Sequence, residues 1–389
     1  MEPLSGLDAT FLAMETQTSR LHVAGILVLE PPDDDASAIR TTDAAASRFD
    51  AIRTVVGERV GRVPRLLRRA VRVPLGVQRP VWVDQAEIDL DAHVHAAAVD
   101  APGGQRELDA LIGKVLSRPL PVDQPLWEMV VADGLAGGRT AVIARLHHAI
   151  LDGVSGATAM AAFLDLTPGR DDGSGTGNHS EEAAPTGTET AAVNPKPTNG
   201  AGLLNPLGLW RYAVSSLARQ PEAAAALVQR TTDLLVALTR HNRELAMKGL
   251  SPPPTPFSAP HTSLNGRVTG VRHVATFGVP LDDLEFVRRV VGPDPSTGSR
   301  GATVNDVILT AVGGALRHYL EEAGENPRRP LVALVPVSTR GPASVPASGR
   351  AHVGNYVSGM LVPLATTEED PVARLRAVAN ASAVAKMQE

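Results

Sequence analysis

The distribution of hydrophobic residues along the chain predicts a mixture of strands and helices. Runs of aliphatic and β-branched residues predict strands over residues 22–30, 127–133, 140–146, 272–279, 331–337 and 357–362. Hydrophobic residues spaced three or four positions apart predict helices over residues 106–116, 155–166, 284–291, 307–320 and 372–386. The glycine-containing stretch 134–138 is typical of the turn of a hairpin between two of these strands. The pattern therefore predicts an α/β fold with mixed sheets.

A polar stretch near the middle of the chain predicts the domain organisation. Residues 168–200 contain six Gly, four Pro and a single large aliphatic residue, Val193. Such a segment buries too little apolar surface to offset the entropy lost on ordering, so we expect a mobile linker over residues 168–202. It separates an N-terminal domain, 1–167, from a C-terminal domain, 203–389. Because the last predicted helix runs to the end of the chain, we expect the C-terminal domain to be truncated.

Composition excludes several classes of function. The net charge of −5 disfavours a general nucleic-acid binder. The absence of cysteine excludes disulfides, thiolate metal sites and a cysteine nucleophile. The first twenty residues lack the features of a signal peptide, and no apolar run is long enough to span a membrane. We therefore expect a cytoplasmic protein without a membrane span.

The sequence His147-His148-Ala-Ile-Leu-Asp152-Gly153 is the strongest indication of chemistry. Side chains alternate along a strand, so one histidine can face a cleft while the other packs behind it. Asp152 and Gly153 then suit the turn towards the next helix. A histidine so placed suits general-base catalysis. Two alternatives stay open: a metal site, for which His93 and His95 offer a weak second pair, and a purely structural histidine pair.

The same motif, read with others along the chain, resembles a known family. The further motifs are PLSGLDATFL (3–12), PLWEM (125–129), TSLNG (262–266), TVNDVILTAVGGALR (303–317) and HVGNYVSGMLVPL (352–364). Together they resemble the bacterial wax ester synthase/diacylglycerol acyltransferase family, actinobacterial type, over nearly the whole chain. This resemblance implies two domains of the chloramphenicol-acetyltransferase-like superfamily that meet at a central cleft or tunnel.

The resemblance also implies a reaction. His148 would act as general base and take a proton from the hydroxyl of diacylglycerol or of a long-chain alcohol, which then attacks the thioester of a long-chain acyl-CoA. No covalent intermediate, metal or other cofactor is implied, and His147, Asp152 and Gly153 would support the loop. Two alternatives are a condensation-type or alcohol acyltransferase of the same superfamily, and a non-catalytic protein that binds lipid or coats lipid droplets.

Two further motifs each have a functional and a structural interpretation. Asn305 and Asp306 match a family motif that implies a place near the substrate cleft, but Thr303 and Asp306 also form a capping box at the start of a helix. The residues Pro125, Leu126 and Trp127 either line the substrate channel or pack in the core.

Two more segments are candidates for contact with lipid. A basic run at near-helical spacing predicts a solvated face, or attraction to anionic lipid or to the phosphates of CoA; it contains Arg59, Arg62, Arg65, Arg68, Arg69 and Arg72. The apolar segment 203–247 predicts either packing between domains or docking on the inner membrane or a lipid droplet.

Overall fold

The computed structural model describes residues 2–31, 42–73, 78–151, 156, 159–164, 243, 247, 254, 258–293, 301–338 and 357–386. These residues form two compact units. The first unit contains the described residues up to 164 together with residues 270–274, and the second contains the rest. The predicted linker lies outside the described residues, as does the segment 203–247 apart from two positions. The roles assigned to these two segments therefore stay predictions.

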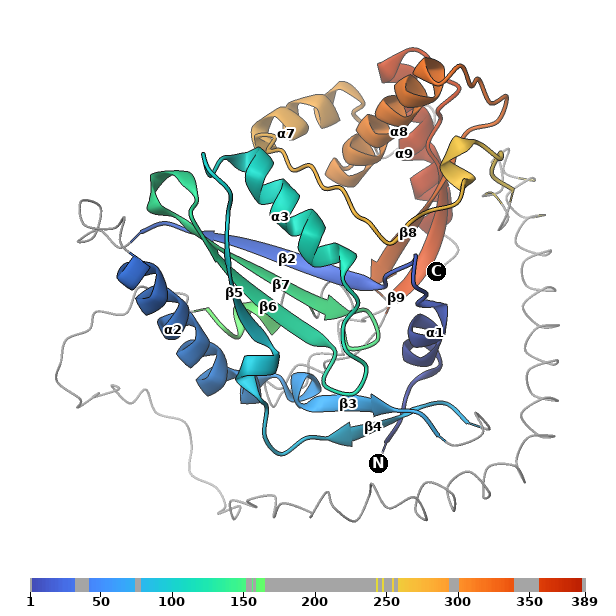
Figure 1. The fold of residues 1–389 in the computed structure, drawn as a ribbon. Coiled ribbons are helices and arrows are strands. Elements are labelled where there is room, and N and C mark those ends of the chain that lie inside the picture. The colour runs from blue at the N-terminus through green and yellow to red at the C-terminus, as the bar shows by residue number, and fades with distance from the viewer. Residues whose placement is uncertain are drawn as a thin grey trace, which may run out of the picture. The chain divides into compact units, whose positions relative to one another are not determined.

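A four-stranded sheet forms the centre of the first unit, in the order β2–β7–β6–β5 (Figure 1). Its strands are β2 (His22–Leu29), β5 (Val94–Ala98), β6 (Trp127–Asp133) and β7 (Thr140–His147). β6 and β7 are antiparallel neighbours joined through the turn η6 (Ala136–Gly138), which confirms the predicted hairpin. β2 is antiparallel to β7, and their register places His22 opposite His147. A histidine from the start of the chain thus lies beside the predicted functional motif.

Helices cover both faces of this sheet and explain why β6 is buried along almost its whole length. The predicted helix α3 (Gln105–Ser117) packs Leu108 and Ile112 against Val130 and Ile143 on one face. Because side chains alternate along a strand, the neighbouring residues of β6 point to the other face. That face belongs to a second core, to which α2 (Thr42–Arg59) and α1 (Gly6–Met14) contribute. Neither α1 nor α2 was predicted from the hydrophobic pattern.

A second, smaller sheet has the order β1–β4–β3, with all neighbours antiparallel. Its strands are β1 (Glu2–Pro3), β3 (Arg68–Val71) and β4 (Val81–Asp84). The described residues of the first unit also include the short 3₁₀ turns η2 (Val60–Arg62), η3 (Pro64–Leu67) and η5 (Leu90–Ala92). The buried Trp82 of β4 joins the sheet to the core that contains Leu4 and Leu66.

The basic run from Arg59 to Arg72 does not form the predicted solvated helical face. α2 ends at Arg59, Pro64 starts a new turn, and β3 follows at once. Several of the guanidinium groups are held by the protein itself. Arg59 donates to the carbonyl of Phe163, Arg65 lies 5.5 Å above the Trp82 ring and 3.6 Å from Asp8, and Arg68 pairs with Glu2 and Asp84 at 2.6 Å each. At least three of the six arginines therefore make contacts within the first unit.

The described residues of the second unit include three long helices and a two-stranded antiparallel sheet. These are α7 (Leu281–Val290), α8 (Val304–Glu322), α9 (Pro371–Lys386), β8 (Val332–Ser338) and β9 (Val357–Pro363), with the short turn η8 (Ser263–Asn265) before them. Each of these three helices and two strands was predicted from the sequence. Met360 and Val362 of β9 are buried against Val378 of α9.

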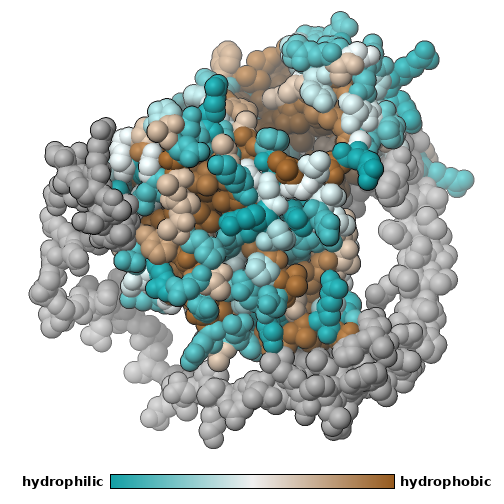
Figure 2. Space-filling model, in the orientation of Figure 1, coloured by the Kyte–Doolittle hydropathy of each residue, from teal (hydrophilic) through white to brown (hydrophobic). Residues whose placement is uncertain are grey.

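Large hydrophobic side chains reach the surface of the second unit around α7 (Figure 2). Phe277, Leu281 and Phe286 are 89%, 64% and 72% exposed. In the part of the chain that the structure describes, no helix is both long and apolar enough to cross a membrane.

The strand predicted over residues 272–279 is wrong, because residues 271–280 form neither a strand nor a helix. The start of this segment instead docks on α3. The backbone N–H of Arg272 donates to the Ser117 hydroxyl at 2.7 Å, where a strand would use a neighbouring carbonyl. A Cβ atom on Gly113 would lie 2.6 Å from the Arg272 carbonyl oxygen, so glycine is what permits this approach. A helix side chain therefore replaces a sheet neighbour as hydrogen-bond partner.

Candidate active site

The two histidines of the motif lie at the end of β7 in different environments. His147 is the last residue of the strand and is completely buried. His148 follows the strand and is partly exposed. Its backbone N–H donates to the carbonyl of Leu21 at 2.8 Å, which extends the pairing with β2 by one residue. Of the two histidines, only His148 is partly exposed.

Both ring nitrogens of His147 are engaged within the protein. The backbone N–H of Ala149 donates to Nδ1 at 3.0 Å, so this nitrogen carries a lone pair. The proton of the neutral ring must then be on Nε2, which lies 3.0 Å from a carboxylate oxygen of Glu15. His147 thus contacts Glu15 and the backbone just after His148, and its predicted role in supporting the loop stays a prediction.

Glu15 binds a second histidine on its other oxygen. Nε2 of His22 lies 3.3 Å from that oxygen, and the His22 side chain is only 2% exposed. Burial raises the pKa of Glu15, but the hydrogen bonds and charges of His147 and His22 outweigh burial and lower that pKa to about 2. Glu15 is therefore a carboxylate at neutral pH and accepts one hydrogen bond from each ring.

Helix α1 supplies a contact to each histidine of the motif. The ring of Phe11 stacks on that of His148, with centroids 4.9 Å apart and planes 25° apart. Glu15 is the C-cap of the same helix, four residues after Phe11, so both side chains project from one face. The helix therefore sets the aromatic wall beside His148 and the carboxylate beside His147 together.

The two histidines considered as possible metal partners, His93 and His95, make contacts away from the histidine pair. Asp152 and Gly153 lie outside the described residues. His93 stacks on Trp127, with ring centroids 4.3 Å apart, whereas His95 is next to Glu128. No group of three or more His, Asp or Glu among the described residues is arranged to hold a metal ion.

Pro125, Leu126 and Trp127 are all buried in the first unit. The indole N–H of Trp127 donates to the carbonyl of Leu66 at 2.9 Å, and its carbonyl accepts from Nδ1 of His93 at 2.8 Å. These contacts are those of a core residue. The prediction that this motif lines a substrate channel stays a prediction.

Asp306 and Asn305 lie in the first turn of α8, in the second unit. Asp306 is 2% exposed and accepts from the backbone N–H of Thr303 at 2.8 Å and from its hydroxyl at 2.7 Å. The predicted capping box is thus confirmed. The side chain of Asn305 is exposed, and its role near the substrate stays a prediction.

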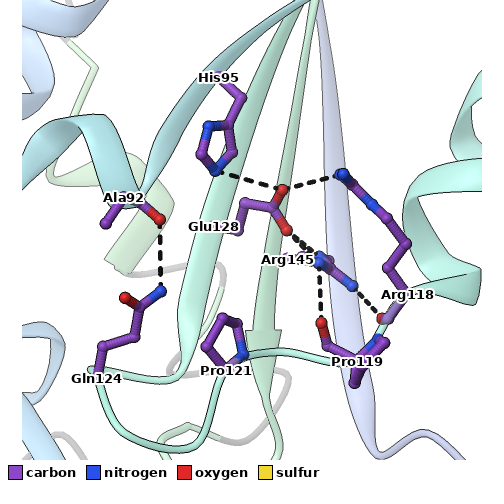
Figure 3. A pocket seen from close by; sticks show the side chains of 8 residues that line it. All are labelled: Ala92, His95, Arg118, Pro119, Pro121, Gln124, Glu128 and Arg145. Atoms are coloured by element: carbon purple, nitrogen blue, oxygen red, sulfur yellow. Dashed lines mark hydrogen bonds and ion pairs between the residues drawn. The ribbon is translucent and has the colours of Figure 1, made fainter.

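A pocket of about 170 Å³ in the first unit contains a second polar cluster (Figure 3). The Oε2 oxygen of Glu128 accepts from both Nε and Nη2 of Arg145, and its Oε1 oxygen accepts from Arg118 at 2.9 Å. Arg145 donates in addition to the carbonyls of Arg118 and Pro119, which follow the end of α3. These groups satisfy one another, so the cluster joins β6 and β7 to the end of α3.

Comparison with known proteins decides the family. The model of the wax ester synthase/diacylglycerol acyltransferase catalytic domain matches residues 4–308. Two relatives from Mycobacterium tuberculosis carry the name diacylglycerol O-acyltransferase as a provisional assignment. One is 34% identical over 97% of this chain and 69% of its own length. The other is 32% identical over 99% of this chain and 67% of its own length.

The chain belongs to the wax ester synthase/diacylglycerol acyltransferase family. It is therefore an acyltransferase of that family, and the resemblance seen in the sequence motifs is confirmed.

Solved structures confirm the fold class. A wax ester synthase/diacylglycerol acyltransferase from Marinobacter aquaeolei VT8 matches with a TM-score of 0.59 and 22% identity, over 99% of this chain and 72% of that one. The first condensation domain of the calcium-dependent antibiotic synthetase matches with a TM-score of 0.52 and 17% identity, over 100% of this chain and 75% of that one. The fold is therefore mixed α/β and of the chloramphenicol-acetyltransferase-like type.

Sequence reasoning missed three residues that contact the histidine pair or its carboxylate partner. Phe11 lies inside the N-terminal family motif, which was noted only as a resemblance, and Glu15 follows that motif by three residues. His22 opens a correctly predicted strand, but nothing in the local pattern shows that it faces the histidine pair. The sequence offered one signal: Glu15 and His22 are polar residues close to the N-terminal family motif 3–12.

Proposed function

We propose that this chain transfers a long-chain acyl group from acyl-CoA to the hydroxyl of diacylglycerol, and so makes triacylglycerol. Long-chain alcohols would be alternative acceptors and give wax esters. Family membership and the names of the Mycobacterium tuberculosis relatives support this substrate class. A peripheral place at the inner membrane or at lipid droplets would bring the enzyme to these acceptors.

His148 acts as the general base. The observation that carries this assignment is the contrast between the two histidines: His147 is completely buried with both nitrogens engaged, whereas His148 is partly exposed beside Phe11. The neutral imidazole of His148 takes the proton of the acceptor hydroxyl, which raises the nucleophilicity of that oxygen. General-base catalysis of this kind contributes about 10²–10⁴-fold.

The reaction then proceeds without an acyl-enzyme. The acceptor oxygen attacks the thioester carbonyl, and the tetrahedral intermediate collapses with cleavage of the carbon–sulfur bond. The CoA thiolate leaves and receives the proton held by the His148 imidazolium. In this proposal Asp152 and Gly153 shape the loop after the histidine pair. The family resemblance makes Asn305 and the residues Pro125, Leu126 and Trp127 candidates for contact with the substrates.

The test is CoA release from palmitoyl-CoA with diacylglycerol or hexadecanol as acceptor. His148→Ala should lower acceptor-dependent release by at least 10²-fold. His95→Ala is the matched control, because His95 is a partly exposed histidine of the same sheet outside the pair, and it should retain activity. Acceptor-independent release, or equal activity of His148→Ala and wild type, would refute the assignment. A protein that binds lipid but never releases CoA would instead be a non-catalytic relative.

A further inference from the structure

The buried group formed by His22, Glu15 and His147 has no direct contact with a reactant in the proposed mechanism. We propose that Glu15 and His22 are positioning residues, which hold His147 in a single tautomer and thereby fix the backbone that carries His148. This proposal rests on the proposed role of His148 as general base.

The first step concerns the tautomer of His147. Its Nδ1 accepts the Ala149 N–H, and its Nε2–H donates to Glu15, both at 3.0 Å. Moving the proton to Nδ1 would leave two hydrogens facing each other at Ala149 and two lone pairs facing each other at Glu15. Because His147 is completely buried, water cannot compensate for either loss. The Glu15 carboxylate therefore determines which nitrogen carries the proton.

The second step concerns the place of His22. Its Nε2 donates to the Glu15 oxygen that His147 does not use, so the two rings hold the carboxylate from two sides. The other nitrogen of His22, Nδ1, is buried and has no hydrogen-bond partner among the described residues. A buried polar atom without a partner is unfavourable, and an apolar side chain would avoid that cost. The imidazole is therefore best explained by its one hydrogen bond, which goes to Glu15.

The third step connects this group to His148. The carbonyl of Leu21, immediately before His22, accepts the backbone N–H of His148 at 2.8 Å. The same helix that ends at Glu15 presents Phe11 to the His148 ring. A shift of the carboxylate would thus move the loop through His147 and the aromatic wall through α1. The carboxylate therefore acts on His148 without touching it.

Three variants separate the hydrogen bond from the shape of the side chain. His22→Phe keeps a ring but removes the donor, while His22→Gln keeps an N–H donor close to the position of Nε2. Glu15→Gln keeps the shape but offers one oxygen where two donors need two. Thr140→Val is the matched control: Thr140 is buried on the same strand as His147, and its hydroxyl donates to Asp133 at 2.6 Å, at the other end of β7.

The first measurement is the ¹⁵N–¹H correlation spectrum of the histidine rings in the full chain at pH 7, with His147 assigned from a His147→Gln sample. Wild type should show His147 protonated at Nε2 alone. Glu15→Gln and His22→Phe should show a mixture of tautomers, whereas His22→Gln and Thr140→Val should keep the wild-type signal. An unchanged His147 signal in both Glu15→Gln and His22→Phe would overturn the proposal.

The second measurement is the kinetics of acyl transfer from palmitoyl-CoA. Glu15→Gln and His22→Phe should lower kcat on the order of tenfold or more, with KM for palmitoyl-CoA within about twofold, since misplacing a catalytic imidazole affects the chemical step. His22→Gln should recover most of the loss. If Thr140→Val lost as much kcat, loss of stability would explain the effect and the positioning role would be refuted. Absence of transfer by wild type would refute the proposed function. It would leave the effect of Glu15 and His22 on the His147 tautomer open to test, because the ring spectrum measures that tautomer independently.

Discussion

Replacing Glu128 by alanine tests how strongly the first unit depends on one buried ion pair. The guanidinium of Arg145 is 2% exposed and the carboxylate of Glu128 is 7% exposed. Burial lowers the pKa of Arg145, and the hydrogen bonds and charge of Glu128 oppose that shift, so this carboxylate offsets part of the cost of burying the cation. Without Glu128, Arg145 retains only the carbonyls after α3 and stays a buried charge without a counter-ion.

The expected loss of stability in Glu128→Ala is large because the charge of Arg145 stays buried. Removing one partner of a buried ion pair costs about 3–5 kcal/mol of the free energy of unfolding. For a unit of 150–250 residues this lowers the melting temperature by roughly 6–20 °C. Replacing both partners, as Glu128→Leu with Arg145→Met, should recover most of the loss, since apolar side chains of similar volume need no counter-ion.

Urea unfolding followed by circular dichroism measures these differences, with Asp100→Ala as the control. Asp100 lies 3.6 Å from Lys114, and both side chains are at least 70% exposed. That pair is screened by water, so its loss should change the free energy of unfolding by less than about 1 kcal/mol. If Glu128→Ala cost no more than Asp100→Ala, or if the double replacement were the least stable of all, the burial argument would be refuted.

Three further predictions concern packing, pH and capping. Gly113→Ala should lower the melting temperature, because its Cβ would lie 2.6 Å from the backbone oxygen of Arg272, whereas Gly57→Ala meets only a leucine methyl and should change it little. Burial lowers the pKa of His93 below the usual 6.5, so the unfolded state binds the extra proton and stability should fall as pH drops below about 6.5. Urea titrations at pH 7.5 and 5.5 should show a smaller difference for His93→Phe. Thr303→Ala should cost about 1 kcal/mol in thermal unfolding through loss of the helix cap, and an unchanged melting temperature would contradict the capping box.

Local patterns in the sequence determined much of the secondary structure and the identity of the histidine pair. The two aliphatic strands of the hairpin, the amphipathic helix α3 and the capping box of α8 were all predicted and are all present in the structure. These features depend on residues within a few positions of one another, so periodicity and capping chemistry are sufficient to predict them. The prediction for the basic run from Arg59 to Arg72 was wrong because it relied on local spacing alone. Pro64 starts a new turn, and residues 68–71 pair with β4 instead of continuing a helix.

Only the tertiary structure decided what surrounds the histidine pair. Glu15 and His147 are 132 residues apart in the chain, and they meet because α1 packs beside the antiparallel pair β2–β7. The docking of Arg272 on α3 likewise joins residues 155 positions apart. No local pattern reports such contacts, because they depend on strand register and helix packing. The sequence by itself thus pointed to the histidine pair, whereas the fold determined that the Glu15 carboxylate contacts His147 and that His22 contacts Glu15.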